Sequence, residues 1–279
     1  MSTTVLTNQL GSKSHADTAL KAAAGFWFLV AVIGQWVFLY YIVAFYGRST
    51  FTGDFQAWTK NTFLKQGYIA GDRVGNLVFA AHALLAAVIA FGGAIQLIPQ
   101  IRTRAIGVHR WNGRLFALTA LGLSISGLYT LWMHGKTPSP FDVHALVISL
   151  NAVLFITFIA LAWRSAFRRD ISTHRRWALR AYLVANAQWF TRVGYMAWFM
   201  VSRLFRIGEG FDRPFFLFWD FGCYLVPLAV LELYLRAKQS ASPSGRLAMA
   251  GSLAVLTILM GVGIFGFYMF SRPLLEAVK

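Results

Sequence analysis

The sequence predicts an all-α integral membrane protein with about seven transmembrane helices and a duplicated helical-hairpin core. Of its 279 residues, 57% are hydrophobic and only 13% are charged, which is far from the balance of a soluble domain. Mostly apolar segments of roughly 20 residues, the length that spans the hydrocarbon core as a helix, recur along the whole chain. Two consecutive pairs of these segments also share one sequence pattern, which is typical of a duplicated structural unit.

Taken in order, the chain begins with a polar stretch, residues 1–22, which we expect to be a cytoplasmic tail. It lacks the pattern of a cleaved signal peptide, so the first apolar segment should be retained as a span. The predicted spans are 23–46, 76–98, 112–133, 143–163, 178–203, 214–236 and 247–270. No separate soluble domain is predicted, so residues 1–279 form a single transmembrane domain.

Within this domain, residues 47–75 form an outer loop that is too long for a simple connection, and we expect it to fold onto the outer mouth as a lid. Residues 76–203 are the duplicated hairpin core, and 214–270 holds the last two spans. No span is expected to be broken at mid-membrane, although Pro227 is a candidate kink. Cys223, the single cysteine, lies inside the sixth span and most simply serves packing.

The net charge of +16 is unevenly distributed, because Lys and Arg concentrate in the loops after the second, fourth and sixth spans. Cytoplasmic loops of membrane proteins carry such an excess, so the pattern predicts a cytoplasmic N-terminus and a C-terminus outside. We expect a multi-pass protein of a bacterial inner membrane. The same distribution argues against nucleic acid as a partner and favours contact with membrane lipids that have anionic heads. Oligomeric state is not predicted by composition.

The duplicated pattern reads His-Ala-Leu, a hydrophobic helix, a basic loop, and His-Arg-(Arg)-Trp before another helix. Its landmarks are His82 and His109 in the first copy, and His144 and His174 in the second. Alternate spans run in opposite directions, so His82 and His144 should lie toward the outer side and the other two at the inner side. If the hairpins are related by a pseudo-two-fold axis along the membrane normal, each pair can face across the core.

Imidazole is a suitable ligand for iron, and a helix N-terminus favours the neutral ring that can act as one. Each pair is therefore predicted to supply two axial ligands to a haem iron, with two haem b groups roughly 20 to 25 Å apart across the bilayer. A lone histidine near a membrane interface is alternatively a hydrogen-bonded rim residue. Small residues would leave room for a macrocycle or would serve close helix packing: Gly92, Gly93, Gly113, Gly122 and Gly127.

Two charged residues are predicted inside spans, where charge is costly: Arg192 in the fifth and Asp220 in the sixth, at matching depth. One interpretation is a mutual ion pair between neighbouring spans. The other is that Arg192 binds a haem propionate or an anionic substrate while Asp220 orients it. Asn151, Asn186 and Gln188 are candidates for interhelical hydrogen bonds.

The strings HAL, HRW-x-GR and HRRW-x-x-R-x-Y, across the second to fifth spans, resemble a bacterial family of multi-span membrane proteins of unknown function. One histidine on each of four consecutive helices also looks like the two-haem transmembrane b-type cytochromes. That likeness implies an outer haem on His82 and His144 and an inner haem on His109 and His174. It implies electron transfer, a transmembrane oxidoreductase, and a quinone or small molecule as electron donor or acceptor. Those cytochromes usually have six spans, and no donor motif is found here.

The alternative function needs no haem. The same spans would form a transporter, or a binding or assembly protein, for an anionic lipid, a quinone or a small solute. The two inner HRW clusters would then grip the anionic head, and Arg192 with Asp220 would form a gated site. The absence of a predicted break in any span argues against the transporter.

Overall fold

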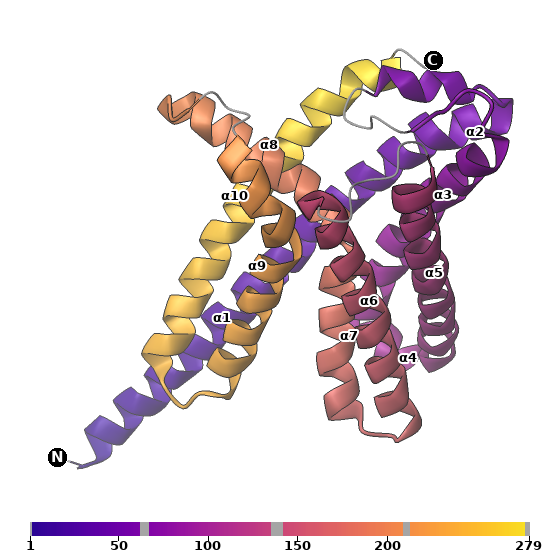
Figure 1. Cartoon of the computed structure of the whole chain (residues 1–279). Coiled ribbons are helices and arrows are strands. Elements are labelled where there is room, and N and C mark those ends of the chain that lie inside the picture. The colour runs from indigo at the N-terminus through magenta and orange to yellow at the C-terminus, as the bar shows by residue number, and fades with distance from the viewer. Residues whose placement is uncertain (1, 62–66, 135–141, 209–212, 277–279) are drawn as a thin grey trace. The chain divides into compact units, whose positions relative to one another are not determined.

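The computed structural model describes residues 2–61, 67–134, 142–208 and 213–276, with side chains described from His15 onward. All regular secondary structure in these ranges is helical (Figure 1). Six of the helices in the described ranges are long and apolar enough to cross a membrane. The predicted all-helical, multi-pass membrane fold is therefore confirmed, and the count of about seven spans stays a prediction.

The chain divides into two compact units. Unit 1 comprises Met1–Gly34 and Arg192–Gly266, and unit 2 comprises Gln35–Thr191 and Phe267–Lys279. Three long helices therefore contribute to both units. The four histidines of the predicted haem sites all belong to unit 2, whereas Arg192 and Asp220 belong to unit 1.

Unit 2 is built around two helical hairpins, one in each copy of the repeated sequence. Their helices are α3 (Arg73–Leu97), α4 (Pro99–Arg104) and α5 (Ile106–Met133), then α6 (Val143–Phe167) and α7 (Ile171–Ala185). α5 packs on α3 and on α6, and α6 packs on α7 (Figure 1). The short α4 occupies the turn of the first hairpin, whereas a tight turn with Arg169 in the left-handed region (φ 59°) joins α6 to α7.

Three of these helices begin in the same way, because an aspartate precedes each one. The side chains of Asp72, Asp142 and Asp170 accept hydrogen bonds from the backbone N–H groups of Gly75, Ala145 and Thr173. Each carboxylate satisfies a donor that the helix itself leaves unpaired, and its negative charge suits the positive end of the helix dipole.

The predicted fifth span, 178–203, is not one helix. α7 ends at Ala185, and α8 (Ala187–Phe205) begins after Asn186, whose φ and ψ are −94° and 12°. The amide of Asn186 donates to the carbonyl of Tyr182 at 2.7 Å, and the amide of Asn151 on α6 donates to the carbonyl of Val184 at 3.3 Å. Side-chain amides thus take over carbonyls at the end of α7. The prediction of an unbroken span is wrong, whereas the interhelical role of Asn151 is confirmed.

In the N-terminal region, α1 (Ser2–Tyr41) already includes most of the polar stretch 1–22, whose place as a cytoplasmic tail stays a prediction. Helical hydrogen bonding does not require an apolar sequence, so a helix can begin well before the apolar segment. α1 continues as a π-helix, η1 (Ile42–Gly47), and then as α2 (Arg48–Thr52). The apolar window of this candidate span lies within His15–Thr52.

The outer segment 47–75 is folded over most of its length, and its residues 62–66 lie outside the described ranges. It contains α2 and a 3-10 helix, η2 (Phe55–Lys60). Trp58 is 1% exposed, and its indole N–H donates to Ser49 at 2.6 Å. The amide of Asn61 donates to the hydroxyls of Tyr41 and Tyr46 at 2.8 and 2.9 Å. These contacts attach the segment to η1 and to the end of α1; its function as a lid stays a prediction.

Unit 1 contains most of α8, all of α9 (Arg213–Gln239), most of α10 (Pro243–Glu276) and the first part of α1. Leu20 and Ala23 of α1 pack against Met249, Ala250 and Leu253 of α10. An ion pair between Asp17 and Arg246 joins the same two helices. α9 continues without interruption through Pro227, so no helix end forms at this predicted kink.

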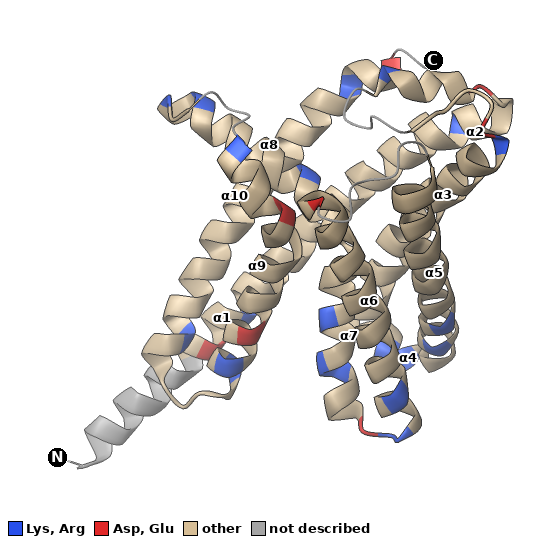
Figure 2. Cartoon of the chain, in the orientation of Figure 1, with Lys and Arg blue, Asp and Glu red and all other residues tan. Residues whose placement is uncertain are grey.

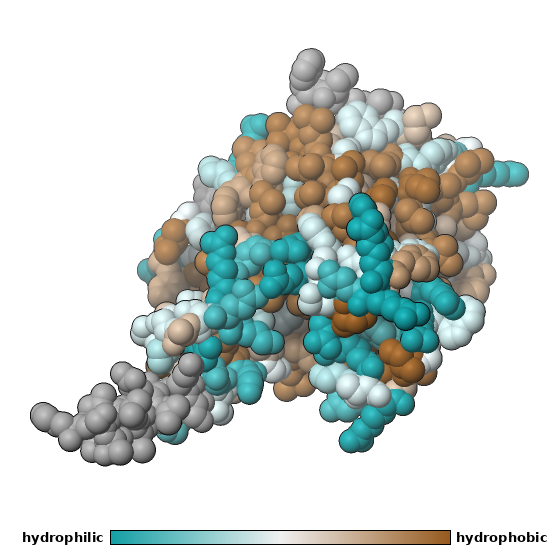
Figure 3. Space-filling model, turned by 90° about the horizontal axis from the view of Figure 1, so that it is seen from below, coloured by the Kyte–Doolittle hydropathy of each residue, from teal (hydrophilic) through white to brown (hydrophobic). Residues whose placement is uncertain are grey.

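Basic side chains concentrate at one end of unit 2, and they also occur at the corresponding ends of α9 and α10 in unit 1. Figure 2 shows Lys and Arg at the lower ends of α4 to α7 in unit 2, and at the lower ends of α9 and α10 in unit 1. The view from below shows hydrophilic side chains gathered on this face, with hydrophobic surface beside them (Figure 3). Within each unit, the loops predicted to be cytoplasmic thus lie at a common, hydrophilic end.

Candidate functional site

The inner histidine pair is the one that the structure places in register. His109 lies three residues after the first residue of α5, and His174 lies three residues after the first residue of α7. The two imidazoles are close enough to interact electrostatically, and Arg102 and Arg110 also act on His109. Two histidines from different copies of the repeat therefore lie within electrostatic range of one another at the basic end of unit 2.

Hydrogen bonds define how these two rings are held. Nδ1 of His174 lies 2.9 Å from the carbonyl oxygen of Ala162. Because a carbonyl can only accept, Nδ1 carries the hydrogen, and Nε2 of the neutral ring keeps its lone pair. Nδ1 of His109 is buried and has no hydrogen-bond partner within the described ranges. The backbone of His109 is held by Gln96, whose amide donates to its carbonyl at 2.8 Å.

Asp170 fixes the start of α7, on which His174 lies. Hydrogen bonds from the side chain and backbone of Thr173, and then from Ser172, lower the pKa of Asp170 to about 2. The carboxylate therefore stays ionised at any physiological pH and holds the first turn of α7 as a cap.

Arginine side chains lie near the inner pair. Burial, and then the guanidinium of Arg175, lower the pKa of Arg102 on α4. The ion pairs found among the described residues involve neither Arg102 nor Arg110 nor Arg175. Guanidinium groups that repel one another and lack a carboxylate partner form a site that favours an anionic ligand group.

The outer pair, His82 and His144, is arranged less symmetrically. Nδ1 of half-buried His82 lies 3.1 Å from the hydroxyl of Ser126 on α5. His144 is exposed in the first turn of α6, five residues before Ser149, whose hydroxyl accepts from the indole of Trp132. At 1.5 Å per residue, His144 therefore attaches roughly 10 Å or more nearer the outer end than His82 does. An iron shared by these rings requires the side chains to bridge that offset.

The glycines of the core face side chains of neighbouring helices. A Cβ on Gly93 would lie 3.0 Å from the ring of Tyr182, and a Cβ on Gly127 would lie 2.9 Å from the ring of His82. Gly92, Gly113 and Gly122 similarly face Asn112, Gln96 and Leu85 at 3.1 to 3.2 Å. These contacts support the packing interpretation of the glycines over the one in which they leave room for a macrocycle.

The two HRW strings share a local geometry. The guanidinium of Arg114 lies 4.8 Å from the ring centre of Trp111, and that of Arg180 lies 4.6 Å from the ring centre of Trp177. Both pairs are three residues apart on a helix, where side chains are neighbours. Amphipathic Trp and Arg side chains are typical anchors at a membrane interface.

Arg192 and Asp220 lie on α8 and α9 of unit 1. Between them the structure adds Tyr195, whose hydroxyl donates to a carboxylate oxygen of Asp220 at 2.8 Å. Both Arg192 and Asp220 act electrostatically on this hydroxyl. Tyr195 was missed in the sequence because an aromatic residue inside a span is usually a packing residue.

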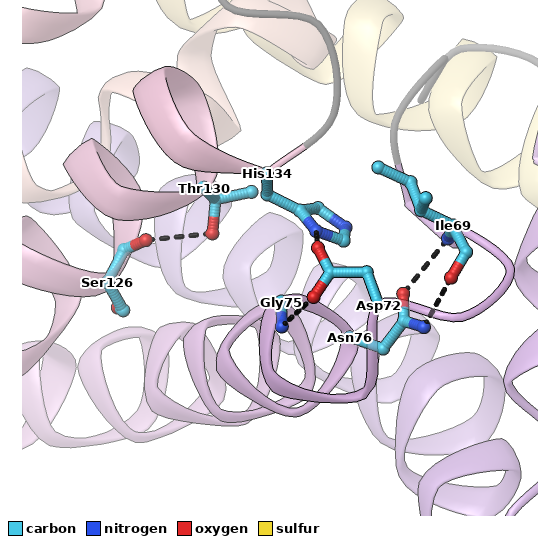
Figure 4. A network of polar contacts seen from close by, with 7 residues as sticks. All are labelled: Ile69, Asp72, Gly75, Asn76, Ser126, Thr130 and His134. Carbon is cyan, nitrogen blue, oxygen red and sulfur yellow. Dashed lines mark hydrogen bonds and ion pairs between the residues drawn. The ribbon is translucent and has the colours of Figure 1, made fainter.

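No pattern in the sequence singles out His134, which directly follows α5. Its side chain is fully buried, and its Nδ1 lies 2.8 Å from a carboxylate oxygen of Asp72 (Figure 4). The two residues are 62 positions apart. The pair is visible only in the folded structure, where the start of α3 and the end of α5 bring the two residues together.

Most of these residues lie in a region that matches a known protein family. A family described as predicted membrane protein, DUF2306, matches residues 79–235, which is more than half of the chain. The chain belongs to this family. Comparison with curated proteins and with solved structures found no match.

The DUF2306 region extends from α3 into α9. It contains the four histidines, both HRW strings, Arg192 and Asp220, whereas the outer segment 47–75 and α10 lie outside it. The family carries no activity in its description, so function has to be argued from the site itself.

Proposed function

We propose that this DUF2306 protein is a membrane-embedded haem protein that carries electrons across the bilayer. The observation that carries the proposal is the inner pair, with His109 and His174 at the same position of their helices and within electrostatic reach of one another. Two haem b groups are proposed, one on this pair and one on His82 and His144. Bound haem supplies a one-electron carrier at each site.

The residues of the inner site fit such a group in two respects. His174 presents Nε2 as its lone-pair nitrogen because Nδ1 donates to Ala162, and His109 has a buried nitrogen without a partner within the described ranges. Arg102 and Arg175 provide positive charge, which haem propionates require, and neither forms an ion pair with a carboxylate within the described ranges. For Arg192, the equivalent proposal is that its guanidinium binds a haem propionate or an anionic substrate.

The rest of the proposal follows from topology. The protein would be a multi-pass protein of a bacterial inner membrane with seven crossings, in which α7 and α8 together make the interrupted fifth. The N-terminus would be cytoplasmic and the C-terminus outside. A transmembrane oxidoreductase of this kind would exchange electrons with a quinone or another small molecule.

The visible spectrum of the detergent-purified protein, before and after dithionite, tests the proposal. We expect a b-type spectrum, and we expect His109→Ala and His174→Ala to remove the same component. Combining the two changes should add almost nothing, because residues that serve one site are not additive. His82→Ala and His144→Ala should remove the other component together.

His15→Ala is the matched control, since His15 lies on α1 in unit 1 and should leave the spectrum unchanged. A colourless protein from cells with ample haem would overturn the proposal. Independent, partial losses in the two inner variants would show that these histidines do not share an iron.

One observation favours a second function. The break at Asn186 interrupts a segment predicted to cross the membrane, and interrupted helices form substrate sites in many transporters. In that case the protein is colourless and the cations near His109 bind an anionic lipid, a quinone head or a small solute. Binding of vesicles rich in anionic lipid should then weaken in Arg102→Gln and not in Arg48→Gln.

A further inference from the structure

The two inner histidines occupy the same position of their helices, but their rings are held differently. His109 and His174 each lie three residues after the first residue of their helix, α5 and α7, and both side chains are half-buried. α7 packs on α6, whereas α5 follows the short α4 (Figure 1). A difference between two rings at equal positions therefore reflects the neighbours that each helix meets.

His174 is anchored at both its ring and its backbone. Nδ1 donates to the carbonyl of Ala162 on α6 at 2.9 Å, and the backbone N–H donates to the carbonyl of Asp170 at 2.9 Å. A neighbouring helix thus fixes the tautomer and the orientation of the ring. Nε2 is the only nitrogen of this ring that can bind a metal.

The ring of His109 has no such anchor. Its backbone N–H donates to the carbonyl of Ala105 at 3.1 Å, but neither ring nitrogen forms a hydrogen bond within the described ranges. Nδ1 is buried, and an unsatisfied buried nitrogen costs free energy. Whichever nitrogen of His109 binds iron, no protein acceptor within the described ranges holds the other one.

The helix that carries His109 is nevertheless fixed. Gln96 of α3 donates to the carbonyl of His109 at 2.8 Å, and a Cβ on Gly113 would lie 3.2 Å from Nε2 of the same amide. One residue earlier, the amide of Asn112 donates to the carbonyl of Gly92 at 2.8 Å. Because these contacts hold α5 against α3, the freedom of His109 is limited to rotation of its side chain.

A hydrogen bond to the second nitrogen of a ligating histidine orients the ring and raises its basicity, and its loss typically weakens metal binding by roughly 10- to 100-fold. His174 has this bond and His109 lacks it. We propose that His174 is the permanent axial ligand of the inner haem and that His109 is exchangeable, so that a small gas molecule such as carbon monoxide takes its place. The inference rests on the proposed electron-transfer function.

The exchange is a simple ligand substitution. The bond between iron and a nitrogen of His109 breaks, and a bond between iron and the gas forms. The imidazole leaves as a neutral ring, so no electron and no proton is transferred. Steric access is one of the factors that decide between gas binding and electron transfer at a haem. Since the ring of His109 moves while α5 does not, the position that opens is small and suits a diatomic molecule.

A carbon monoxide titration of the dithionite-reduced, detergent-purified protein tests the proposal. The spectral component that is lost in His174→Ala should shift on addition of the gas. In His109→Ala, carbon monoxide should bind this component roughly 10- to 100-fold more tightly than in the wild-type protein, because no internal ligand competes for the iron. The wild-type titration requires no substitution, so it remains decisive where a variant does not fold.

The haem content of the two variants gives a second measurement. Both lose the spectrum that two histidines produce, but His109→Ala should keep the inner haem on His174, whereas His174→Ala should lose most of it. The two changes are matched, since they remove the same side chain from the same position of a helix. Free imidazole should restore the wild-type spectrum of His109→Ala, because it fills the position that the ring leaves.

The outcomes separate this proposal from the proposed function. A wild-type inner component that does not respond to carbon monoxide, with equal haem loss in the two variants, overturns the exchange and leaves the electron carrier intact. Retention of haem in His174→Ala and its loss in His109→Ala overturns the assignment of the two roles. A protein without haem overturns both proposals.

Discussion

At the scale of the residue, the buried polar side chains are the positions where we expect substitutions to lower the stability of the fold most. Asp220 lies inside a predicted span, where a charge is tolerated only with partners. Tyr195 supplies one such partner through its hydroxyl at 2.8 Å. Tyr195 is thus a third member of the polar group predicted from Arg192 and Asp220 alone.

Tyr195→Phe should lower the free energy of unfolding by about 1.5 to 3 kcal/mol, because it removes a hydrogen bond to a charged group. In the Asp220→Leu background the same change should have almost no effect, since the interaction is already lost. Thermal unfolding in detergent measures both.

Tyr234→Phe on α9 is a suitable control, because no hydrogen bond of the Tyr234 hydroxyl is found within the described ranges. Equal effects of Tyr195→Phe with and without Asp220 would mean that the hydrogen bond contributes nothing to stability. In that case the two residues are neighbours without energetic coupling.

At the scale of the element, close helix crossings decide which glycines matter. In unit 1, a Cβ on Gly263 of α10 would collide with the backbone carbonyl of Val193 on α8. A Cβ on Gly261 of the same helix would meet nothing within 4 Å. Two glycines two positions apart thus have opposite surroundings, although the local sequence is similarly apolar.

Gly263→Ala should therefore destabilise unit 1 by about 1 to 3 kcal/mol, because backbone cannot move aside as a flexible side chain can. Gly261→Ala should be neutral or stabilising by up to about 1 kcal/mol, since alanine favours the helix. The melting temperatures of the two variants give the comparison. Similar destabilisation in both would exclude a specific crossing of α8 and α10 at Gly263.

The break between α7 and α8 is also a property of elements. The segment around Asn186 is apolar enough to predict one span, and the side-chain amide that ends α7 acts through a bond to the Tyr182 carbonyl. Propensity alone does not show whether an asparagine will compete with helical hydrogen bonds, because the outcome depends on the packing around it.

At the scale of the whole molecule, the number of crossings sets the side of the C-terminus. If α7 and α8 cross as one interrupted span, the protein has seven crossings and its termini lie on opposite sides. If they do not cross, the six remaining spans put both termini on the same side. The basic loops after α9 would then lie outside, against the usual distribution of positive charge.

A reporter fused after Lys279 should therefore behave as periplasmic, and a second reporter inserted after Ser240 should behave as cytoplasmic. Reversed results at both positions would establish six crossings. The two copies of the repeat would still form hairpins, but α7 would no longer continue through α8 to the outer side.

The sequence by itself determined the features that depend on near neighbours in the chain. The length of the apolar segments predicts a multi-pass helical protein. The repeat also led to His109 and His174 as a pair, because hairpin topology follows from segment order. What only the tertiary structure decided depends on residues far apart: the burial of His134 against Asp72, the collision that fixes Gly263, and the end of α7 at Asn186. Such contacts follow from which helix faces meet, and the local pattern of apolar and polar residues in a membrane segment is nearly the same on a lipid-facing side and on a packed one.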